Sequence, residues 1–432
     1  MTYEQALSYI ASLEGRGWRL GLDRMEEMIR RSNLTDSVGK SSGPQFIHIA
    51  GTNGKGSTTA FVQSILVASG HQTGAFFSPY VVDPRERIQL NRELITREEL
   101  VAVTEKLIPI AESFSETDFG GITEFEFKTA IGFEFWKQKR CDWVALEVGL
   151  GGRLDATNVI TPRASIVVSI GLDHINILGN TLAQIAYEKS GIIKPGIPVI
   201  VGNMSEEARN VILNEANERE SPVWQWGRDI RWIPENRAVE TPLGRHDGLA
   251  PSLIGPIQTH NLALAIAAVE ASGAYTSEEA LREGARLATI PGRFQVITYH
   301  DRTVICDGAH NPDSAQILVQ TLAKEYPDRS VVLVTNMLAG HEPEEFYQTL
   351  RPKVKSVHVV PVDFHRSTPV ESMVNKLSPI FKRVNGHQTP IEGLNAAVIE
   401  ASVSDLVVVT GSFYLVGELL RELTTLDAST GS

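Results

Sequence analysis

The stretch FIHIAGTNGKGSTTAFVQSIL, residues 46–66, decides the fold of this chain. The apolar FIHIA predicts a buried strand, a glycine-rich turn follows, and the segment from Ser57 onward has the spacing of a helix. Strand, turn and helix in this order form the unit that binds phosphate in P-loop proteins. The spelling differs from the usual P-loop, because Gly51 precedes Gly54 by only three residues and Gly56 separates Lys55 from Ser57.

Two interpretations of this turn compete. In the first, backbone N–H groups at the helix N-terminus bind phosphate with the help of the helix dipole. Lys55 then neutralises phosphate oxygens, and Ser57 offers its hydroxyl to Mg²⁺. In the second, the turn only connects strand and helix, with Ser57 as the N-cap. Strand, loop, lysine and serine occurring together favour phosphate binding.

Strands and helices alternate along the whole chain. Short, continuously apolar strands such as DWVALEV and ASIVVSI predict a parallel sheet covered by helices on both faces. We therefore expect an α/β fold with a P-loop-type, doubly wound, mostly parallel sheet domain over 1–292. A small antiparallel insert is expected at about 222–256. The junction PGRF leads to a smaller Rossmann-like α/β domain over 293–432.

Composition narrows the class of protein. The 432 residues carry a net charge of -12, which argues against a general binder of nucleic acid or anionic membranes. The only two cysteines, Cys141 and Cys306, cannot form a disulfide framework, so a cytoplasmic location is expected. The N-terminus lacks the features of a signal peptide, and no apolar run approaches the roughly 18 residues of a membrane span.

Polar residues follow several predicted strands, at the sheet edge where doubly wound folds bind ligands. Glu147 ends the strand DWVALEV, and a buried carboxylate there is costly unless it is paired or bound to metal. Asp173 and His174 follow the next strand and suit either a divalent cation or a purely structural role. Asp307 and His310 follow a strand of the second domain.

Other candidates have a local explanation. Lys189 lies in the last turn of a predicted helix ended by Gly191, where a cation is favoured in any case. Thr123 and Glu126 have the spacing of a capping box.

Nine motifs together resemble one family. In order they are GTNGKGS, FSPYVVDPRERI, TEFEFKTA, LEVGLGGRLDATN, LDH…LG, IAYEKSGIIK, PGRFQVI, CDGAHNP and TGSFYLVGE. The chain resembles the folylpolyglutamate synthase and dihydrofolate synthase family, part of the Mur ligase superfamily, over about residues 45–420. The unusual loop spelling is this family's signature.

The resemblance implies an ATP-dependent ligase that joins L-glutamate to dihydropteroate or a reduced folate through an acyl phosphate. It implies two Mg²⁺ ions, and we expect a monomer. The implied ATP-binding residues are Gly51, Thr52, Asn53, Gly54, Lys55, Gly56, Ser57, Asn261, Arg293 and Asp307. The implied metal ligands are Ser57, Ser78, Glu147 and His174, and the implied pterin-binding residues are Thr123, Glu124, Phe125 and Glu126. The implied catalytic residues are Lys55, Lys189, His174, Asp307 and His310, with Lys189 carbamylated.

Alternatives within and outside the class stay open. The leading hypothesis is a bifunctional dihydrofolate and folylpolyglutamate synthase, and a monofunctional folylpolyglutamate synthase is the alternative. Mur peptidoglycan ligases usually have Lys-Thr-Thr rather than Lys-Gly-Ser, and a P-loop regulatory protein would not need the second domain. The chain departs from the family at Tyr80, where His is frequent, and in the loop Gly340, His341, Glu342.

Overall fold

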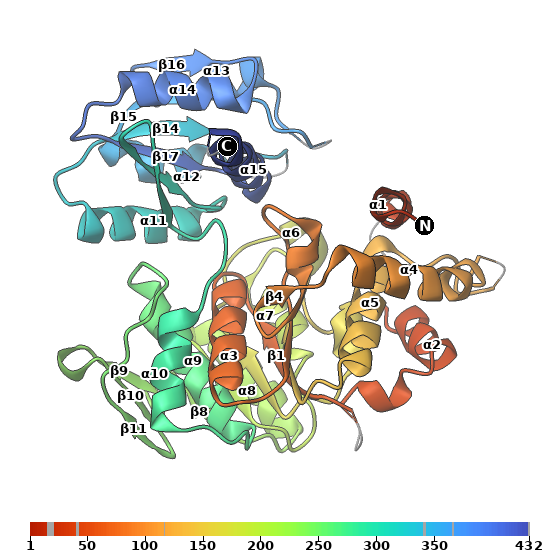
Figure 1. Cartoon of the computed structure of the whole chain (residues 1–432). Coiled ribbons are helices and arrows are strands. Elements are labelled where there is room, and N and C mark those ends of the chain that lie inside the picture. The colour runs from red at the N-terminus through yellow and green to blue at the C-terminus, as the bar shows by residue number, and fades with distance from the viewer. Residues whose placement is uncertain (15–20, 40–42, 116, 340–342, 365–366, 431–432) are drawn as a thin grey trace. The chain divides into compact units, whose positions relative to one another are not determined.

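The computed structural model describes residues 1–430 apart from 15–20, 40–42, 116, 340–342 and 365–366, so the atypical loop 340–342 lies outside the described residues (Figure 1). The chain forms two units. The first comprises Met1–Pro79, Arg85–Ser252 and Thr259–Thr289, and the second comprises Tyr80–Pro84, Leu253–Gln258 and Ile290–Ser432.

The first unit is built on an eight-stranded sheet in the order β4-β3-β2-β5-β1-β6-β7-β8. The six strands from β2 to β8 in that order run parallel, and β3 and β4 add an antiparallel edge. The strands are β1 (Gln45–Ala50), β2 (Thr73–Phe76), β3 (Ile88–Leu90), β4 (Glu93–Leu94), β5 (Trp143–Glu147), β6 (Ala164–Val167), β7 (Val199–Val201) and β8 (Val223–Gln225).

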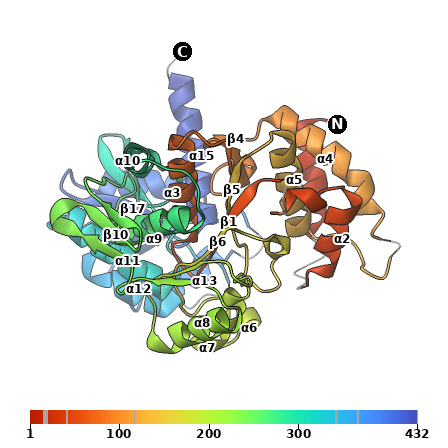
Figure 2. The same cartoon turned by 90° about the horizontal axis from the view of Figure 1, so that it is seen from below.

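Helices cover both faces of this sheet. On one face α1, α2, α4 and α5 share an apolar core with β1, β2 and β5, and α7 and α8 pack on β6 and β7. On the other face α3 packs on β1, β2 and β5, and α10 lies beside α3 (Figures 1 and 2). The helices are α1 (Tyr3–Ser12), α2 (Asp23–Arg31), α3 (Lys55–Ala68), α4 (Arg97–Glu112), α5 (Glu124–Gln138), α6 (Ile175–Leu178), α7 (Leu182–Ser190), α8 (Glu206–Glu218), α9 (Ile257–Ala271) and α10 (Glu278–Leu287).

Glycines set two close approaches in this unit. A Cβ on Gly74 of β2 would lie 2.5 Å from the ring of Trp136, so the glycine makes room for the fully buried indole. A Cβ on Gly284 of α10 would lie 2.5 Å from the Cα of Ile65 in α3. Because backbone atoms cannot move aside as a side chain does, this glycine fixes how closely α10 packs on the helix of the glycine-rich loop.

The second unit contains a six-stranded sheet in the order β12-β13-β17-β14-β15-β16, parallel except for β12. Two apolar cores cover its faces, one with α11, α12 and α13 and the other with α14 and α15. The elements are β12 (Gln295–Tyr299), β13 (Arg302–Cys306), α11 (Pro312–Glu325), β14 (Val331–Thr335), α12 (Pro343–Leu350), β15 (Val354–Val359), α13 (Val370–Leu377), β16 (Val384–Gly386), α14 (Pro390–Glu400), β17 (Leu406–Thr410) and α15 (Phe413–Thr430).

The expected fold class is confirmed: a doubly wound, mostly parallel sheet unit is followed by a smaller α/β unit. The antiparallel insert is present as the sheet β11-β10-β9, made of β9 (Arg231–Ile233), β10 (Ala238–Thr241) and β11 (Gly244–His246). The segment Val223–Gln225, expected within the insert, instead pairs with β7 as the last strand of the large sheet. No helix in the described part of the chain is long and apolar enough to cross a bilayer.

His246 ties the insert to two helices. Its Nε2 lies 2.9 Å from Glu270 Oε1 on α9, and its Nδ1 lies 2.6 Å from Glu278 Oε1 on α10. Burial by itself lowers the pKa of His246, but the hydrogen bonds to both carboxylates outweigh burial and raise the pKa above 6.5. Since each ring nitrogen lies within ion-pair distance of a carboxylate, both glutamates favour the imidazolium form.

We expect His246→Gln to destabilise the first unit by about 1–3 kcal/mol at pH 6, because one or both glutamates lose their cationic partner. The raised folded-state pKa makes this contribution complete below about pH 6.5. It is lost as the pH rises through the folded-state pKa. Thermal unfolding from pH 5.5 to 9 should therefore show a difference from wild type that shrinks with rising pH.

The matched control is His71→Gln, which removes a histidine whose Nε2 meets only the carbonyl of Tyr275 at 2.9 Å among its described hydrogen bonds. A destabilisation by His246→Gln that stays constant across this pH range would contradict a stabilising role for the protonated His246 ring between Glu270 and Glu278.

Candidate functional site

The glycine-rich loop ends at a helix N-terminus with no capping side chain. Gly54 is the N-cap of α3 and has a left-handed φ of 84°, and α3 begins at Lys55. Ser57 therefore lies inside the first turn, so the alternative that made Ser57 the N-cap is wrong. Because no side chain occupies the first N–H groups of α3, they can accept an anion.

The loop is fastened to the segment that follows β6. Thr52 N–H donates to Ser169 O at 2.9 Å, and Asn53 N–H donates to Ser169 Oγ at 3.0 Å. The hydroxyl of Thr52 donates to Gly171 O and accepts from Gly171 N–H. These bonds hold the loop in one conformation before a ligand binds. Ligand binding therefore costs little conformational entropy in this loop.

Lys55 reaches back across the loop that it follows. Its Nζ donates to Gly51 O at 3.0 Å and to Thr52 O at 3.3 Å. The ammonium is thus held at the loop, where it can neutralise phosphate oxygens as the sequence predicts.

Asn261 of α9 lies against the same loop. A Cβ on Gly54 would come within 2.8 Å of Asn261 Oδ1 and 2.9 Å of Val168 Cγ1. Only glycine fits here, because the residue has a left-handed φ and there is no room for a Cβ. The structure thus brings Asn261 together with the predicted phosphate loop, although the two are far apart in sequence.

We expect Gly54→Ala to weaken the binding of an ATP analogue by at least about tenfold, because the methyl group displaces Asn261 or the loop. Isothermal titration calorimetry measures the affinity, and thermal unfolding shows whether the variant still folds. The control is Gly70→Ala. Gly70 has a φ of 85° just after the other end of α3, but a Cβ there meets nothing within 4 Å.

Both variants carry a left-handed alanine, at a cost of about 1–2 kcal/mol, but only Gly54→Ala should lose nucleotide affinity. Equal affinities in the two variants would show that the contact with Asn261 has no role in nucleotide binding.

Ser78 and Glu147 come together at the end of two neighbouring parallel strands. β2 and β5 pair with Phe76 opposite Leu146, and Ser78 N–H donates to Glu147 Oε2 at 3.0 Å. Ser78 Oγ accepts a hydrogen bond from Arg87 Nη1 at 3.1 Å, which leaves the hydroxyl a further lone pair. Glu147 itself is only 2% exposed.

These oxygens fit a divalent cation of the Mg²⁺ type. A buried carboxylate and serine hydroxyls are hard ligands, and Mg²⁺ commonly takes one or two protein carboxylates and completes its shell with water and substrate phosphates. Within the described ranges no three His, Cys, Asp or Glu side chains form a group able to hold a metal. Ser78 and Glu147 therefore suit a cation that also takes ligands from water and substrate phosphates.

His174 lies in the loop after β6. It has a φ of 49° and forms the N-cap of α6. Its backbone N–H donates to Asp173 Oδ1 at 2.9 Å, and its ring Nε2 lies 3.9 Å from the same oxygen. The structure thus groups His174 with Asp173, whereas Ser78 and Glu147 are grouped after β2 and β5. Its predicted role as a metal ligand stays a prediction.

The loop that follows Glu147 holds the end of α7. Arg153 N–H donates to Glu188 O at 2.8 Å, and Asn158 Nδ2 donates to Gly191 O at 3.1 Å. A Cβ on Gly191 would lie 2.3 Å from Arg153 Cα, so close approach requires this glycine. Helix α7 ends at Ser190 with Gly191 as its C-cap, as expected, and the φ of Gly191 is -58°.

Lys189 is buried at that helix end, with 5% of its surface exposed. Burial first, and the charge of Lys55 second, lower the pKa of Lys189 to about 7, against the opposing effect of Asp173 and Asp155. Lys189 lies in the last turn of α7, as the local explanation expects, and its burial is a feature that this explanation does not require. A large share of neutral amine is available at neutral pH.

Asp155 is a site residue that sequence reasoning missed. Its carboxylate accepts from Leu150 N–H at 2.8 Å and from Thr157 Oγ1 at 2.5 Å, and Thr157 Oγ1 lies 2.9 Å from His48 Nε2. Burial, and secondarily Lys194, lower the pKa of His48 to about 3. The neutral ring therefore donates to Thr157, which donates to Asp155. This buried chain fixes the turn after Glu147, and the Asp-x-Thr pattern of a side-chain turn could have indicated it.

The predicted pterin-binding segment begins α5. Thr123 and Glu126 form the expected capping box, and Glu126 also pairs with Arg24 Nε at 3.0 Å. Glu124 forms an ion pair with Lys128. The ring of Phe125 packs on the loop after Glu147, because a Cβ on Gly149 would lie 2.3 Å from it. The segment therefore borders the loop of Glu147, and its role toward a pterin stays a prediction.

In the second unit Asp307 directly follows β13. Its carboxylate accepts from Phe294 N–H at 2.8 Å and from Ala309 N–H at 2.9 Å. Burial raises the pKa of Asp307, and the nearby Arg293 opposes this rise.

Arg293 and His310 both lie against Phe413. The guanidinium carbon of Arg293 is 4.2 Å from the ring centroid, and the imidazole of His310 lies edge-on at 5.7 Å. His310 Nδ1 donates to Gly308 O at 2.8 Å, so Nε2 is its remaining polar atom. The three residues predicted for this unit are therefore grouped around one aromatic ring and one strand end.

Comparison with known proteins agrees with this geometry. Residues 292–413 match the Mur ligase glutamate ligase domain family. The dihydrofolate synthase/folylpolyglutamate synthase of Bacillus subtilis is 32% identical over 433 residues, which cover 98% of this chain and 99% of the relative. The chain belongs to the dihydrofolate synthase/folylpolyglutamate synthase family. It is therefore an ATP-dependent ligase.

Solved structures of this family have the same fold. The structure of E. coli FolC in complex with DHPP and ADP has a TM-score of 0.87 and 30% identity, with 98% of each chain covered. The bifunctional folylpolyglutamate synthase/dihydrofolate synthase of Yersinia pestis, complexed with AMPPNP and Mn ion, has a TM-score of 0.86 and 28% identity, again with 98% of each chain covered.

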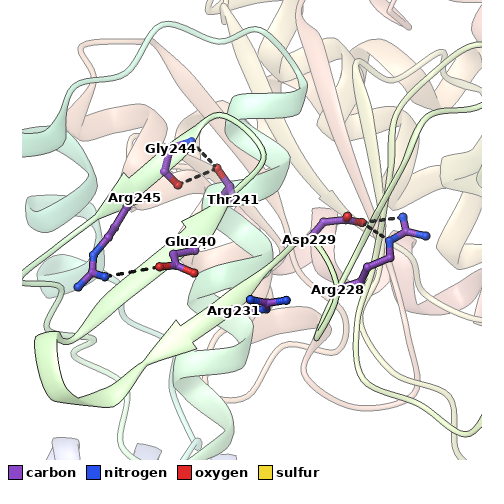
Figure 3. Close-up of a pocket in the computed structure, with 7 residues that line it drawn as sticks. All are labelled: Arg228, Asp229, Arg231, Glu240, Thr241, Gly244 and Arg245. Atoms are coloured by element: carbon purple, nitrogen blue, oxygen red, sulfur yellow. Dashed lines mark hydrogen bonds and ion pairs between the residues drawn. The ribbon is translucent and has the colours of Figure 1, made fainter.

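A pocket of about 320 Å³ on the antiparallel insert contains none of the residues expected for the family (Figure 3). Two ion pairs lie within the lining. Arg228 Nη2 lies 2.6 Å from Asp229 Oδ2, and Arg245 Nη1 lies 3.5 Å from Glu240 Oε1. Glu240 is also in register with Arg231 on the neighbouring strand. Ion pairs thus involve two arginines and both carboxylates of the lining, and Arg245 also pairs with Asp247 beyond it at 3.0 Å.

Proposed function

We propose that this protein adds L-glutamate to dihydropteroate and to reduced folates. The acceptor carboxylate attacks the γ-phosphorus of ATP, ADP leaves, and an acyl phosphate forms. The glutamate amine then attacks the acyl carbon, and inorganic phosphate leaves. The observation that carries the proposal is the hydrogen bond joining Ser78 to Glu147, at the sheet edge where the fastened phosphate loop also lies.

The first unit supplies the groups for phosphoryl transfer. The N–H groups of the loop 51–57 and the ammonium of Lys55 neutralise the triphosphate, and Asn261 contacts the nucleotide beside Gly54. Such a reaction depends on positioning and charge neutralisation, and the fastened loop supports both.

Mg²⁺ supplies charge neutralisation at the phosphates when it is bound. Ser57 and Glu147 are proposed to hold one ion, and Ser78, Glu147 and His174 a second. The hard oxygen donors of Ser78 and Glu147 support the assignment.

Lys189 is proposed to carry a carbamate. A carbamate forms from the neutral amine and carbon dioxide, so a pKa of about 7 supports the modification. The anionic product suits a metal-dependent site, and Lys55 is close enough to stabilise its charge electrostatically.

In the second unit, Arg293 and Asp307 are proposed for nucleotide binding and His310 for glutamate. We expect a monomer in the cytoplasm, a setting that suits the two buried free thiols of Cys141 and Cys306.

The test is ADP release with Mg-ATP and L-glutamate, comparing 7,8-dihydropteroate with tetrahydrofolate as acceptor. Turnover with both acceptors is expected. Turnover with tetrahydrofolate alone would reduce the function to polyglutamylation, and the segment 123–126 would retain only its capping role. ADP release that does not depend on glutamate would contradict ligation and favour a nucleotide-dependent regulatory protein.

We expect Lys189→Ala to lower kcat by at least about 100-fold, the scale of one preorganised charged group in a transition state. Wild-type activity should fall in buffer depleted of carbon dioxide and return on addition of bicarbonate. The bicarbonate effect should be larger at pH 8 than at pH 6, because more of the amine is then neutral.

The control is Lys194→Ala, which removes a lysine that donates to Asn158 O at 3.0 Å near the same helix end. That variant should keep the bicarbonate response, and Lys189→Ala should lack it. Full activity of Lys189→Ala would exclude the carbamate role.

A further inference from the structure

Arg87 lies between Ser78 and the aromatic rings of Phe76 and Phe125. It ends the short 3₁₀ segment Pro84–Arg87 and is 8% exposed. While its Nη1 donates to Ser78 Oγ at 3.1 Å, its guanidinium carbon lies 5.6 Å from the ring centroid of Phe76 and 5.7 Å from that of Phe125. One planar cation therefore joins the proposed metal ligand Ser78 to the aromatic residue of the predicted pterin segment.

A second buried cation lies nearby on α5. Lys128 pairs with Glu124, and only 14% of its side chain is exposed. Burial first, and the charge of Arg87 second, lower the pKa of Lys128 to about 8. Of the other charged groups on this part of α5, Glu126 is paired with Arg24. The charge of Arg87 therefore acts on Lys128 in this buried setting, and Glu124 already balances the charge of Lys128.

The chemistry of the acceptor matches this arrangement, and the match rests on the proposed function. An acceptor of this class has flat rings at one end and a carboxylate at the other. The rings can stack on Phe125, and the carboxylate must reach the phosphoryl group near Ser78 and Glu147. Arg87 lies between these two positions.

We propose that Arg87 binds the acceptor carboxylate that is phosphorylated. A guanidinium offers parallel N–H groups in a plane, which matches the two oxygens of a carboxylate and orients one of them for attack. Arg87 thus makes the acceptor site prefer a carboxylic acid over a neutral analogue. It also orients the carboxylate of the bound acceptor.

The test compares the binding of 7,8-dihydropteroate with that of its carboxamide analogue, by calorimetry in the presence of a non-hydrolysable ATP analogue. Wild type should prefer the acid by about tenfold to 100-fold, the usual worth of hydrogen bonds to a charged group. Arg87→Gln should bind acid and amide equally and keep its affinity for the ATP analogue.

Arg97→Gln is the matched control, because Arg97 also lies over an aromatic ring, at 5.0 Å from the centroid of Tyr3, but on the exposed start of α4. It should keep the preference for the acid. Should Arg87→Gln fail to fold, Arg87→Lys keeps the charge but loses the planar fork, and a preference reduced below wild type is the expected result.

An undiminished preference for the acid in the Arg87 variants would overturn the assignment. Equal weakening of acid and amide would overturn it as well, in favour of a structural role through Ser78. Wild-type protein that binds neither compound would overturn the proposed function itself, and this assignment with it. The two failures are therefore distinguishable.

Discussion

The parallel register of β1 with its two neighbours is the constraint on which the site depends. Ile49 lies opposite Glu147 of β5, and Ala50 lies opposite Val167 of β6. Three chain segments therefore leave the sheet at the same edge: the glycine-rich loop, the segment that begins at Glu147, and the Ser169 segment that fastens the loop. Short side chains can therefore meet at this edge, because the pairing of the strands places the segments next to one another.

Much of this arrangement could be predicted from sequence, because its signals are local. The residue pattern of the contiguous stretch 46–66 is enough to predict its strand, its glycine-rich turn and its helix. The capping box of Thr123 and Glu126 needs only a spacing of three residues, and it formed as expected. Continuous apolar strands likewise predicted a parallel sheet with helices on both faces.

Other features depend on contacts that no local pattern encodes. The hydrogen bond from Ser78 to Glu147 arises because β2 pairs with β5, two strands that are distant in sequence and short. The N-cap of α3 is Gly54 rather than Ser57, and only glycine fits there, because a Cβ would meet Asn261 on a helix that is remote in sequence. The local Asp-x-Thr pattern indicates the turn at Asp155 but not its link to the sheet. Thr157, which donates to Asp155, meets His48 on β1, so this part of the hydrogen-bond chain exists only once the sheet is assembled.

The contact between Gly284 and Ile65 has a consequence for how the first unit can evolve. The helix that starts at the phosphate loop touches α10 backbone to backbone, and α10 receives the insert through Glu278 and His246. Loop helix, α10 and insert thus form one mechanically continuous block. A lineage that enlarged residue 284 would have to reposition α3 at the same time. The insert, although remote in sequence from the glycine-rich loop, is for this reason part of the scaffold that natural variation must keep intact.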